Sequence, residues 1–400
     1  MCRTAIILGQ DGTGLATLFG VPAVRRLTLI LRRLGFEKIH ILGFVDMIAP
    51  VLSDLVSPAS LHRIGEGESL DTAIARMELS GAEQVLVAKA GHVVDRHTME
   101  SFLKHAGSGA VTCLFSAAGD ALHEGIFLVE RSELSPILHL LWSGERIEEA
   151  LARRIKKIEG IGRMPLASDG DPSAARASED ALVAALAMQT HADDGFIARH
   201  FDRHISRRIS SRVARTGMTP NGVTLVGTTI GLTAAFLLSL QGYWPHLLGS
   251  LLFVFCVIVD GVDGEIARLK LKESQFGHYL DITTDNIVHF AIFVGIAYGL
   301  YHDTGSVWYL RILWVMLGGF GLCLLAVYQC ILRLDESQLK ASPNAIRFMA
   351  LLSNRDFAYL IALLALVDRL NWFLIGSAIG SYVFALALWA ISYRERHGSS

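Results

Sequence analysis

The stretch DGVDGEIARLKLKESQFGHYLDITTD, residues 260–285, contains four aspartates and follows 44 residues without Asp, Glu, Lys or Arg. Asp260 and Asp263 are three residues apart, and Asp281 and Asp285 are four apart. At either spacing the two side chains share one face of a helix. Four carboxylates that converge from two helices would repel one another and would need a positive counter-charge. The stretch therefore indicates either a solvated acidic loop or a cation site.

The position of Asp260 favours the cation site. Asp260 directly ends a transmembrane-type apolar run, and ionisable groups at membrane depth are usually functional. Carboxylate oxygens prefer a hard divalent cation such as Mg²⁺, Mn²⁺ or Ca²⁺ over zinc. Such a cation beside Arg268 would suit a substrate that carries phosphates.

The composition indicates a membrane protein with more than one domain. Of the 400 residues, 52% are hydrophobic and 18% are charged, against about 25% charged in ordinary soluble proteins. Single cores stop growing at roughly 250 to 300 residues, so at least one domain boundary is expected. A net charge of -2 gives no sign of nucleic-acid binding. The five cysteines form no CxxC pair and are expected to be reduced packing residues.

Six membrane spans are predicted after residue 215. A span needs about 20 apolar residues, and the fifth candidate has an apolar core of residues 357–367 alone. The predicted spans are residues 222–240, 246–260, 286–302, 312–332, 355–369 and 371–393. Fifteen Lys or Arg residues lie on one side of this arrangement, against Arg311 and Arg369 on the other. By the positive-inside rule, both termini and the aspartate stretch face the cytosol, at the inner membrane.

An amphipathic helix is predicted over residues 197–215, before the first span. Its apolar residues recur every four positions, and arginines occupy the remaining face. The apolar residues are Ile197, Phe201, Ile205, Ile209 and Val213. The pattern favours a helix in the lipid interface. The alternative is a helix packed on a soluble domain.

The first 165 residues have a different pattern. Short apolar runs alternate with helical patterns, which is typical of βαβ units and a mostly parallel sheet. The initial apolar run is too short for a signal peptide, so the N-terminus is expected to stay in the cytosol. Residues 166–196, which include ASDGDPSAARASED, are predicted to be a linker. The expected architecture is thus an α/β domain followed by an all-α, six-helix membrane domain over residues 197–400.

The aspartate stretch resembles the signature of the CDP-alcohol phosphotransferase family, D-x2-D-G-x2-A-R-x8-G-x3-D-x3-D. The matching residues are Asp260, Asp263, Gly264, Ala267, Arg268, Gly277, Asp281 and Asp285. The likeness covers about residues 197–400, including the segment Thr219–Thr224 at the first span. It implies transfer of a phosphoryl-alcohol group, phosphatidyl or inositol-phosphoryl, from a CDP-linked donor to an acceptor alcohol, with release of CMP.

The resemblance also implies roles for individual residues. It implies two Mg²⁺ or Mn²⁺ ions bound by the four aspartates, with Asp285 also acting as the base on the acceptor hydroxyl. The residues implied for CDP binding are Asp260, Gly264, Ala267, Arg268 and Gly277. Lys340, Arg347 and Arg355 could hold an acceptor phosphate, although the positive-inside rule alone explains them. A lipid bilayer and a second copy in a homodimer are the partners implied.

The N-terminal domain resembles a sugar-phosphate nucleotidyltransferase of Rossmann-like fold. A strand and the glycine-rich turn of residues 5–15 carry the likeness, and the fusion is similar to bifunctional inositol-1-phosphate cytidylyltransferase/di-inositol-phosphate-phosphate synthases. Three departures weaken the chemistry. Gly14 replaces an arginine, no lysine follows Pro22, and Gly91 replaces a metal-binding aspartate. We therefore expect a retained fold without cytidylyltransferase activity.

Three other functions stay open from the sequence. An active N-terminal domain would make the protein bifunctional. A transporter with an acidic cation site would have broken helices and polar residues near the bilayer midplane, whereas these acids cluster at one end of the spans. An inert membrane scaffold would have no use for four aspartates without a counter-charge.

Overall fold

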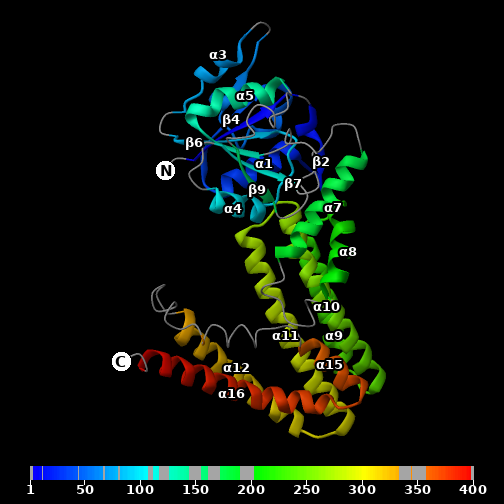
Figure 1. Ribbon diagram of the computed structural model, residues 1–400. Coiled ribbons are helices and arrows are strands. Elements are labelled where there is room, and N and C mark those ends of the chain that lie inside the picture. The colour runs from blue at the N-terminus through cyan, green and yellow to red at the C-terminus, as the bar shows by residue number, and fades with distance from the viewer. Residues whose placement is uncertain are drawn as a thin grey trace. The chain divides into compact units, whose positions relative to one another are not determined.

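The chain begins with alternating strands and helices and continues with long apolar helices (Figure 1). The computed structural model describes residues 3–10, 12–43, 45–65, 68–79, 82–106, 111–116, 126–143, 155–160, 172–189, 202–332, 344 and 357–397. The chain divides into two units. The sheet unit comprises Met1–Thr190, Ala214–Thr216 and Leu269–Leu271. The helical unit comprises His191–Val213, Gly217–Arg268 and Lys272–Ser400.

Seven of the described strands form one sheet in the order β5-β4-β1-β6-β8-β7-β9. They are β1 (Arg3–Gly9), β4 (Phe36–Gly43), β5 (Leu61–Arg63), β6 (Gln84–Lys89), β7 (Val111–Ser116), β8 (Ile126–Glu130) and β9 (Ile155–Gly160). Strand β8 is antiparallel to both of its neighbours, and the remaining pairs are parallel. A separate hairpin joins β2 (Thr17–Leu18) to β3 (Val21–Pro22). The predicted α/β domain with a mostly parallel sheet is confirmed.

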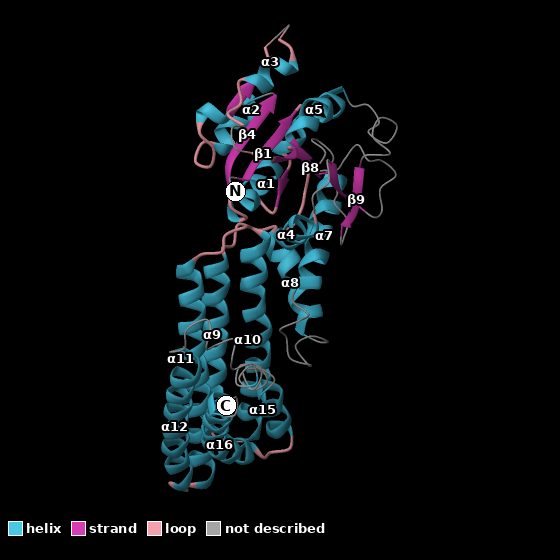
Figure 2. Ribbon diagram, turned by 60° about the vertical axis from the view of Figure 1, so that its left-hand side comes forward, coloured by secondary structure: helices cyan, strands magenta, loops and turns pink. Residues whose placement is uncertain are grey.

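Helices cover both faces of the sheet (Figure 2). Successive residues of β1 point to opposite sides, so Ile7 enters one core and Ile6 and Leu8 enter the other. Helices α1 (Ala23–Arg33), α2 (Val45–Leu52) and α4 (Arg96–His105) pack on the Ile7 side. Helices α3 (Leu70–Ala75) and α5 (Leu134–Ser143) pack on the opposite side. Burial on both faces explains the continuous apolar runs of these strands.

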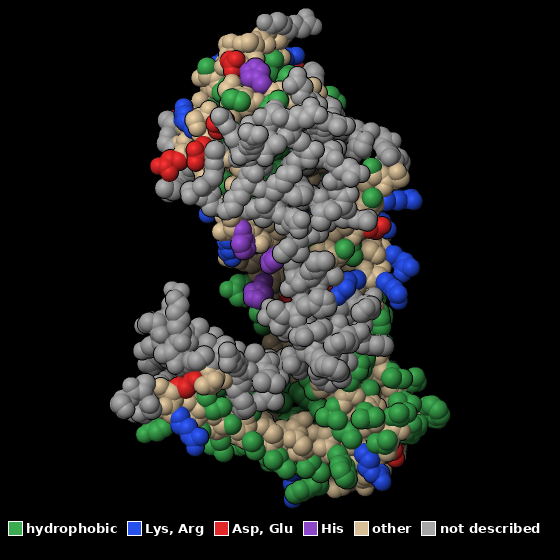
Figure 3. Space-filling model, viewed as in Figure 1, with side chains coloured by type: hydrophobic (Ala, Val, Ile, Leu, Met, Phe, Trp, Pro, Cys, Tyr) green, Lys and Arg blue, Asp and Glu red, His purple; other side chains and the backbone are tan. Residues whose placement is uncertain are grey.

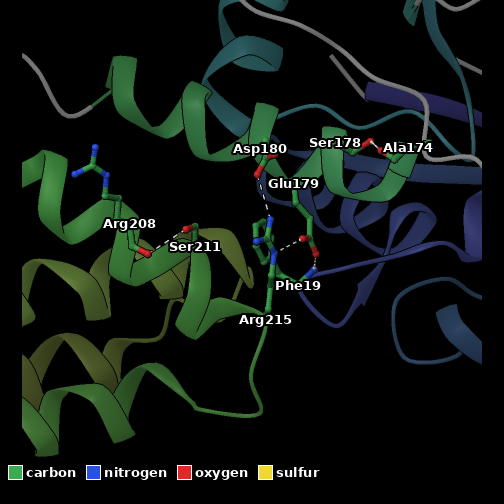
Figure 4. A network of polar contacts seen from close by, with 8 residues as sticks. All are labelled: Phe19, Ala174, Ser178, Glu179, Asp180, Arg208, Ser211 and Arg215. Atoms are coloured by element: carbon green, nitrogen blue, oxygen red, sulfur yellow. Dashed lines mark hydrogen bonds and ion pairs between the residues drawn. The ribbon is translucent and has the colours of Figure 1, made fainter. Parts of the chain in front are cut away.

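Helix α7 (Pro172–Gln189) lies inside the segment that the sequence predicted to be a linker. Proline at the first helical position and frequent alanine both favour helix formation, so the small, polar composition was misleading. The buried Glu179 carboxylate accepts hydrogen bonds from Phe19 N–H at 3.0 Å and from Arg215 Nε at 2.7 Å (Figure 4). The hydrogen bond to Glu179 raises the pKa of Arg215. Through these contacts α7 is part of the sheet unit.

The described helices of the second unit account for five of the six predicted spans. They are α8 (Arg203–Ala214), α9 (Pro220–Ser239), α10 (Tyr243–Leu269), α11 (Gln275–Thr304), α12 (Trp308–Val327), α15 (Phe357–Leu366) and α16 (Leu370–His397). Among the described residues, α9, α10, α11, α16 and α12 with its π-helical extension to Cys330 are long and apolar enough to cross a membrane. The predicted fifth span, 355–369, is represented by the ten-residue α15, which is too short to cross alone. Residues 197–201 of the predicted interfacial helix lie outside the described residues.

Helices α9, α10 and α11 lie side by side and approach closely through glycines (Figures 1 and 2). A Cβ atom at Gly295 of α11 would lie 2.4 Å from the Ala235 carbonyl oxygen of α9. One at Gly299 would lie 2.2 Å from the Leu238 carbonyl oxygen. Small residues allow membrane helices to pack backbone against backbone. These glycines therefore set the spacing between α9 and α11, the helix that carries Asp281 and Asp285.

Hydrophobic side chains are exposed on the surface of the helical unit (Figure 3). Phe236 is 62% exposed, Trp314 is 74% exposed and Leu324 is 73% exposed. Large exposed apolar surfaces are uncommon on soluble monomers. Together with the five long apolar helices, this surface indicates a membrane protein.

Candidate active site

The aspartate stretch forms two helices joined by a tight turn. Helix α10 ends when Leu271 adopts a left-handed conformation, with φ of 53°, and Lys272 N–H donates to the Ala267 carbonyl oxygen at 2.9 Å. This is the hydrogen-bond pattern of a Schellman helix end. The hydroxyl of Ser274 then caps α11 by accepting from Gly277 N–H at 3.0 Å. The turn brings the aspartates of α10 and α11 to the same end of the two helices.

Three of the four predicted metal ligands come together. Asp260 of α10 and Asp281 and Asp285 of α11 are half-buried, and each offers one carboxylate oxygen within 4.8 Å of the others. Like charges this close are unfavourable without a cation between them. One oxygen of Asp281, Oδ1, is buried without a hydrogen-bond partner among the described residues. Such an oxygen fits a metal ligand, so the cluster suits a hard divalent metal.

Asp263, the fourth predicted ligand, has a different environment. It is 7% exposed, and its Oδ2 accepts a hydrogen bond from Thr224 Oγ1 of α9 at 2.5 Å. Asp263 does not belong to the group of three carboxylates described above. Its role as a metal ligand therefore stays a prediction. Thr224 holds this carboxylate in place. The sequence indicated Thr224 only as the end of the segment at the first span.

The glycines of the motif leave room beside polar groups. A Cβ at Gly264 would lie 3.7 Å from the Arg268 guanidinium nitrogens. A Cβ at Gly277 would lie 3.1 Å from both Asn221 Oδ1 and Ser274 Oγ, which is a tight contact. Glycine at these positions keeps the backbone accessible. Asn221 is a second polar residue near the motif that sequence reasoning did not single out.

Other predicted residues have simpler environments. Ala267 is half-buried on α10. His289 packs against Phe253 and Phe357, with ring centroids 6.0 Å and 5.3 Å away. The candidate acceptor residues Lys340, Arg347 and Arg355 lie outside the described residues.

The glycine-rich turn of the sheet unit has little space for added side chains. A Cβ at Gly14 would lie 2.7 Å from Ala90 Cβ, so an arginine would not fit without rearrangement. Ala23, which follows Pro22, is fully buried. Asp95 lies after β6 in the chain. Its carboxylate caps α4 by accepting a hydrogen bond from Thr98 N–H at 3.0 Å. These residues serve packing and capping.

Comparison with known proteins agrees with the geometry of the helical unit. Residues 217–393 match the family model described as CDP-alcohol phosphatidyltransferase. This region, which is less than half of the chain, is similar to CDP-alcohol phosphatidyltransferases. It contains all four aspartates, Arg268 and both motif glycines.

Relatives of the chain carry names from the same chemistry. The bifunctional IPC transferase and DIPP synthase of Archaeoglobus fulgidus is 31% identical over 196 residues, 47% of this chain and 37% of the relative. The archaetidylinositol phosphate synthase of Pyrococcus horikoshii is 36% identical over 92 residues, 23% of this chain and 47% of the relative. The chain thus spans less than half the length of either relative. The chain is also similar to a crystal structure of Mycobacterium tuberculosis phosphatidylinositol phosphate synthase with CDP-DAG bound. The match includes 48% of this chain and 92% of the synthase chain, with 20% identity and a TM-score of 0.31.

Proposed function

We propose that this protein is a membrane CDP-alcohol phosphotransferase. The observation that carries the proposal is the cluster of Asp260, Asp281 and Asp285 on two adjacent helices of the region that is similar to CDP-alcohol phosphatidyltransferases. A hydroxyl oxygen of the acceptor alcohol would attack the phosphorus that bears the donor's alcohol. The new P–O bond forms as the P–O bond to CMP breaks, and CMP leaves with the bonding electrons.

The carboxylates would divide into metal ligands and a base. Two Mg²⁺ or Mn²⁺ ions would be held by Asp260, Asp263, Asp281 and Asp285. When bound, these ions would neutralise negative charge on the donor pyrophosphate. Asp285 would accept the proton of the acceptor hydroxyl. Arg268 would donate hydrogen bonds to a donor phosphate.

The space beside the motif would be taken by the nucleotide. Gly264 and Gly277 leave the backbone open to its close approach, and Ala267 would add a small side chain to the same CDP-binding face. Both glycines stand next to polar groups, Arg268 in one case and Asn221 in the other. A side chain at either position would compete with the donor for this space.

Inositol chemistry is the substrate class that the relatives' names favour. The names of the Archaeoglobus and Pyrococcus relatives include IPC transferase, DIPP synthase and archaetidylinositol phosphate synthase. We therefore propose a CDP-linked lipid or CDP-inositol as donor, and an inositol or its phosphate as acceptor. Lys340, Arg347 and Arg355 remain candidates for an acceptor phosphate. The active site would face the cytosol, and the protein would act as a homodimer.

The sheet unit would not transfer nucleotidyl groups. The buried surroundings of Gly14 and Ala23 support this part of the proposal, because they exclude the cationic side chains that would stabilise a transferring phosphate. Incubation of the full-length Asp285→Asn variant with CTP, Mg²⁺ and inositol 1-phosphate tests it, since the variant would leave any CDP-inositol unconsumed. Formation of CDP-inositol would establish the bifunctional alternative.

The transferase proposal is tested by CMP release. The detergent-solubilised protein, its Asp285→Asn variant and an Asp303→Asn control are incubated with Mg²⁺, a panel of CDP-linked donors and a panel of alcohols. Asp303 lies near the opposite end of α11, where its Oδ1 accepts from Gly242 N–H at 2.7 Å, and the amide oxygen of asparagine preserves this bond. We expect Asp285→Asn to slow CMP release at least about a hundredfold and the control to retain it. Absence of CMP with every pair, or equal release by Asp285→Asn, would refute the proposal.

A further inference from the structure

Helix α8 buries a polar stripe, beside the apolar stripe that the sequence indicated. Ser206 and Ser210 are each 1% exposed, and Asp202, which directly precedes the helix, is 8% exposed. The apolar residues Ile205 and Ile209 are half-buried. The three buried polar residues recur every four positions and therefore share one face. Helix α8 thus packs on its neighbours in the helical unit through polar contacts.

Two serines of this polar stripe donate hydrogen bonds to a carboxylate of α10, the helix that carries Asp260 and Asp263. Glu265 of α10 is 1% exposed and lies between the motif residues Gly264 and Ala267 without being part of the motif. Ser206 Oγ donates to its Oε1 at 2.9 Å, and Ser210 Oγ donates to its Oε2 at 2.6 Å. A buried carboxylate is costly unless its oxygens are hydrogen-bonded. Both oxygens of Glu265 are held by one helix, which defines the position of α10 relative to α8.

The direction in which Glu265 points links its hydrogen bonds with Ser206 and Ser210 to the positions of the Asp260 and Asp263 carboxylates. In an ideal helix Glu265 points about 140° away from Asp260 and about 160° away from Asp263. It therefore holds α10 from the side opposite its aspartates. Side-chain tips lie about 5 to 6 Å from the helix axis, so a rotation of about 20° would move each carboxylate roughly 2 Å. Metal-ligand distances tolerate shifts of about 0.2 Å.

We propose that Glu265 is a positioning residue, which orients Asp260 and Asp263 of α10 toward α11 through its hydrogen bonds to Ser206 and Ser210. The proposal rests on the proposed function in that it assumes a divalent cation at the aspartate cluster. Removing the tie would therefore weaken cation binding, in addition to any loss of stability. Glutamine at position 265 can still accept from one serine and donate to the other, so it preserves the tie.

A matched control comes from another polar contact at the start of α8. Tyr359 of α15 donates a hydrogen bond to Asp202, so this bond joins the start of α8 to α15 instead of to α10. Tyr359→Phe removes this contact alone. A purely structural role of the α8 contacts predicts the same behaviour for Tyr359→Phe and Glu265→Ala.

The experiment titrates Mn²⁺ into the full-length wild-type protein and into Glu265→Ala, Glu265→Gln and Tyr359→Phe, without substrates, and follows the melting temperature. We expect the Mn²⁺ concentration for half of the thermal shift to rise at least about tenfold in Glu265→Ala. It should stay within about twofold of wild type in Glu265→Gln and Tyr359→Phe. An unchanged midpoint in Glu265→Ala, or an equal rise in Tyr359→Phe or Glu265→Gln, would overturn the positioning role.

CMP release measured on the same samples separates the two proposals. A wild-type protein that is stabilised by Mn²⁺ but releases no CMP would refute the transferase function while the Mn²⁺ midpoints still decide the role of Glu265. A wild-type protein without any Mn²⁺-dependent shift would refute the cation site and the positioning role together.

Discussion

Each unit has a glycine beside the start of a helix, but the surroundings of the two glycines differ. In the sheet unit, Gly14 lies against Ala90, and the nearby Asp95 caps a helix. In the helical unit, Gly277 follows the Ser274 cap of α11, and the carboxylates of Asp281 and Asp285 face another carboxylate instead of capping groups. A fold is retained by distributed apolar burial, whereas phosphoryl transfer depends on a few charged groups. We propose that the sheet unit has the apolar core of its fold but lacks the charged groups for phosphoryl transfer.

The largest expected difference between the units concerns their aspartates. Asp281→Asn should slow CMP release at least about a hundredfold, because it removes a carboxylate from the cation site. Asp95→Ala should leave CMP release unchanged and lower the stability of the sheet unit by about 1 kcal/mol, through loss of the α4 cap. Steady-state CMP assays and thermal melts of both variants check this. Comparable losses of activity would mean that the sheet unit takes part in the reaction.

A smaller effect is expected from the helix spacing. Gly295→Ala would place a Cβ 2.4 Å from the Ala235 carbonyl oxygen and should destabilise the helical unit by about 1 to 3 kcal/mol. The matched control is Gly380→Ala, because no described atom outside the neighbouring residues and backbone of α16 lies within 4 Å of a Cβ at that position. Thermal melts in detergent should show a loss for the first variant alone. Equal melting temperatures would contradict the close packing of α9 and α11.

The sheet unit should respond to acid through two buried histidines. His40 Nδ1 lies 2.9 Å from His62 Nε2, and burial, followed by the nearby His62 and Lys38, lowers the pKa of His40 to about 4. In the unfolded chain His40 has a pKa of about 6.5 and therefore binds a proton more readily than in the folded unit. The contribution of neutral His40 to the free energy of unfolding is complete above pH 6.5 and is lost as the pH falls toward 4. At pH 5 the free energy of unfolding is lower by about 2 kcal/mol, which corresponds to about thirtyfold weaker protection of the β4 amides against hydrogen exchange.

Hydrogen exchange of β4 at pH 7 and pH 5, corrected for the intrinsic exchange rates, measures this loss. His40→Phe should flatten the pH dependence, whereas the surface variant His105→Phe should retain it. Because burial also lowers the pKa of His62, a small residual slope is expected in His40→Phe. Equal slopes in the wild type and His40→Phe would contradict the assignment to His40.

The smallest loss of CMP release is expected at the threonine that holds Asp263. Thr224→Val keeps the side-chain shape but removes the hydrogen bond to the buried carboxylate, which costs about 1 to 3 kcal/mol. CMP release should fall about tenfold. Thr228→Val, one turn further along α9, removes a hydroxyl that donates to the Thr224 carbonyl oxygen and should have little effect. A loss of equal size in both variants would point to damage of α9 instead of Asp263.

Several features could be predicted because they depend on local spacing. The pairs Asp260 with Asp263 and Asp281 with Asp285 follow helical periodicity, and apolar runs indicated both the sheet and the long helices. The fifth span, residues 355–369, stays a prediction, because residues 355 and 356 lie outside the described residues and α15 alone has ten residues where a span needs about 20. The α8 pattern predicted a helix correctly. Its buried face is shifted by one residue, from Ile205 and Ile209 to Ser206 and Ser210, because buried serines can satisfy a carboxylate on a neighbouring helix.

The sequence by itself determined the two-part architecture, the family motif and the residue types for a cation site, since periodicity and composition are local properties of the chain. The tertiary structure decided which groups meet. It brought Asp260 to Asp281 and Asp285, paired Asp263 with Thr224 and enclosed Glu265 between Ser206 and Ser210. These contacts join residues that lie up to 59 positions apart in the chain. Their geometry depends on how closely the helices pack, which glycines such as Gly295 control and no local pattern states.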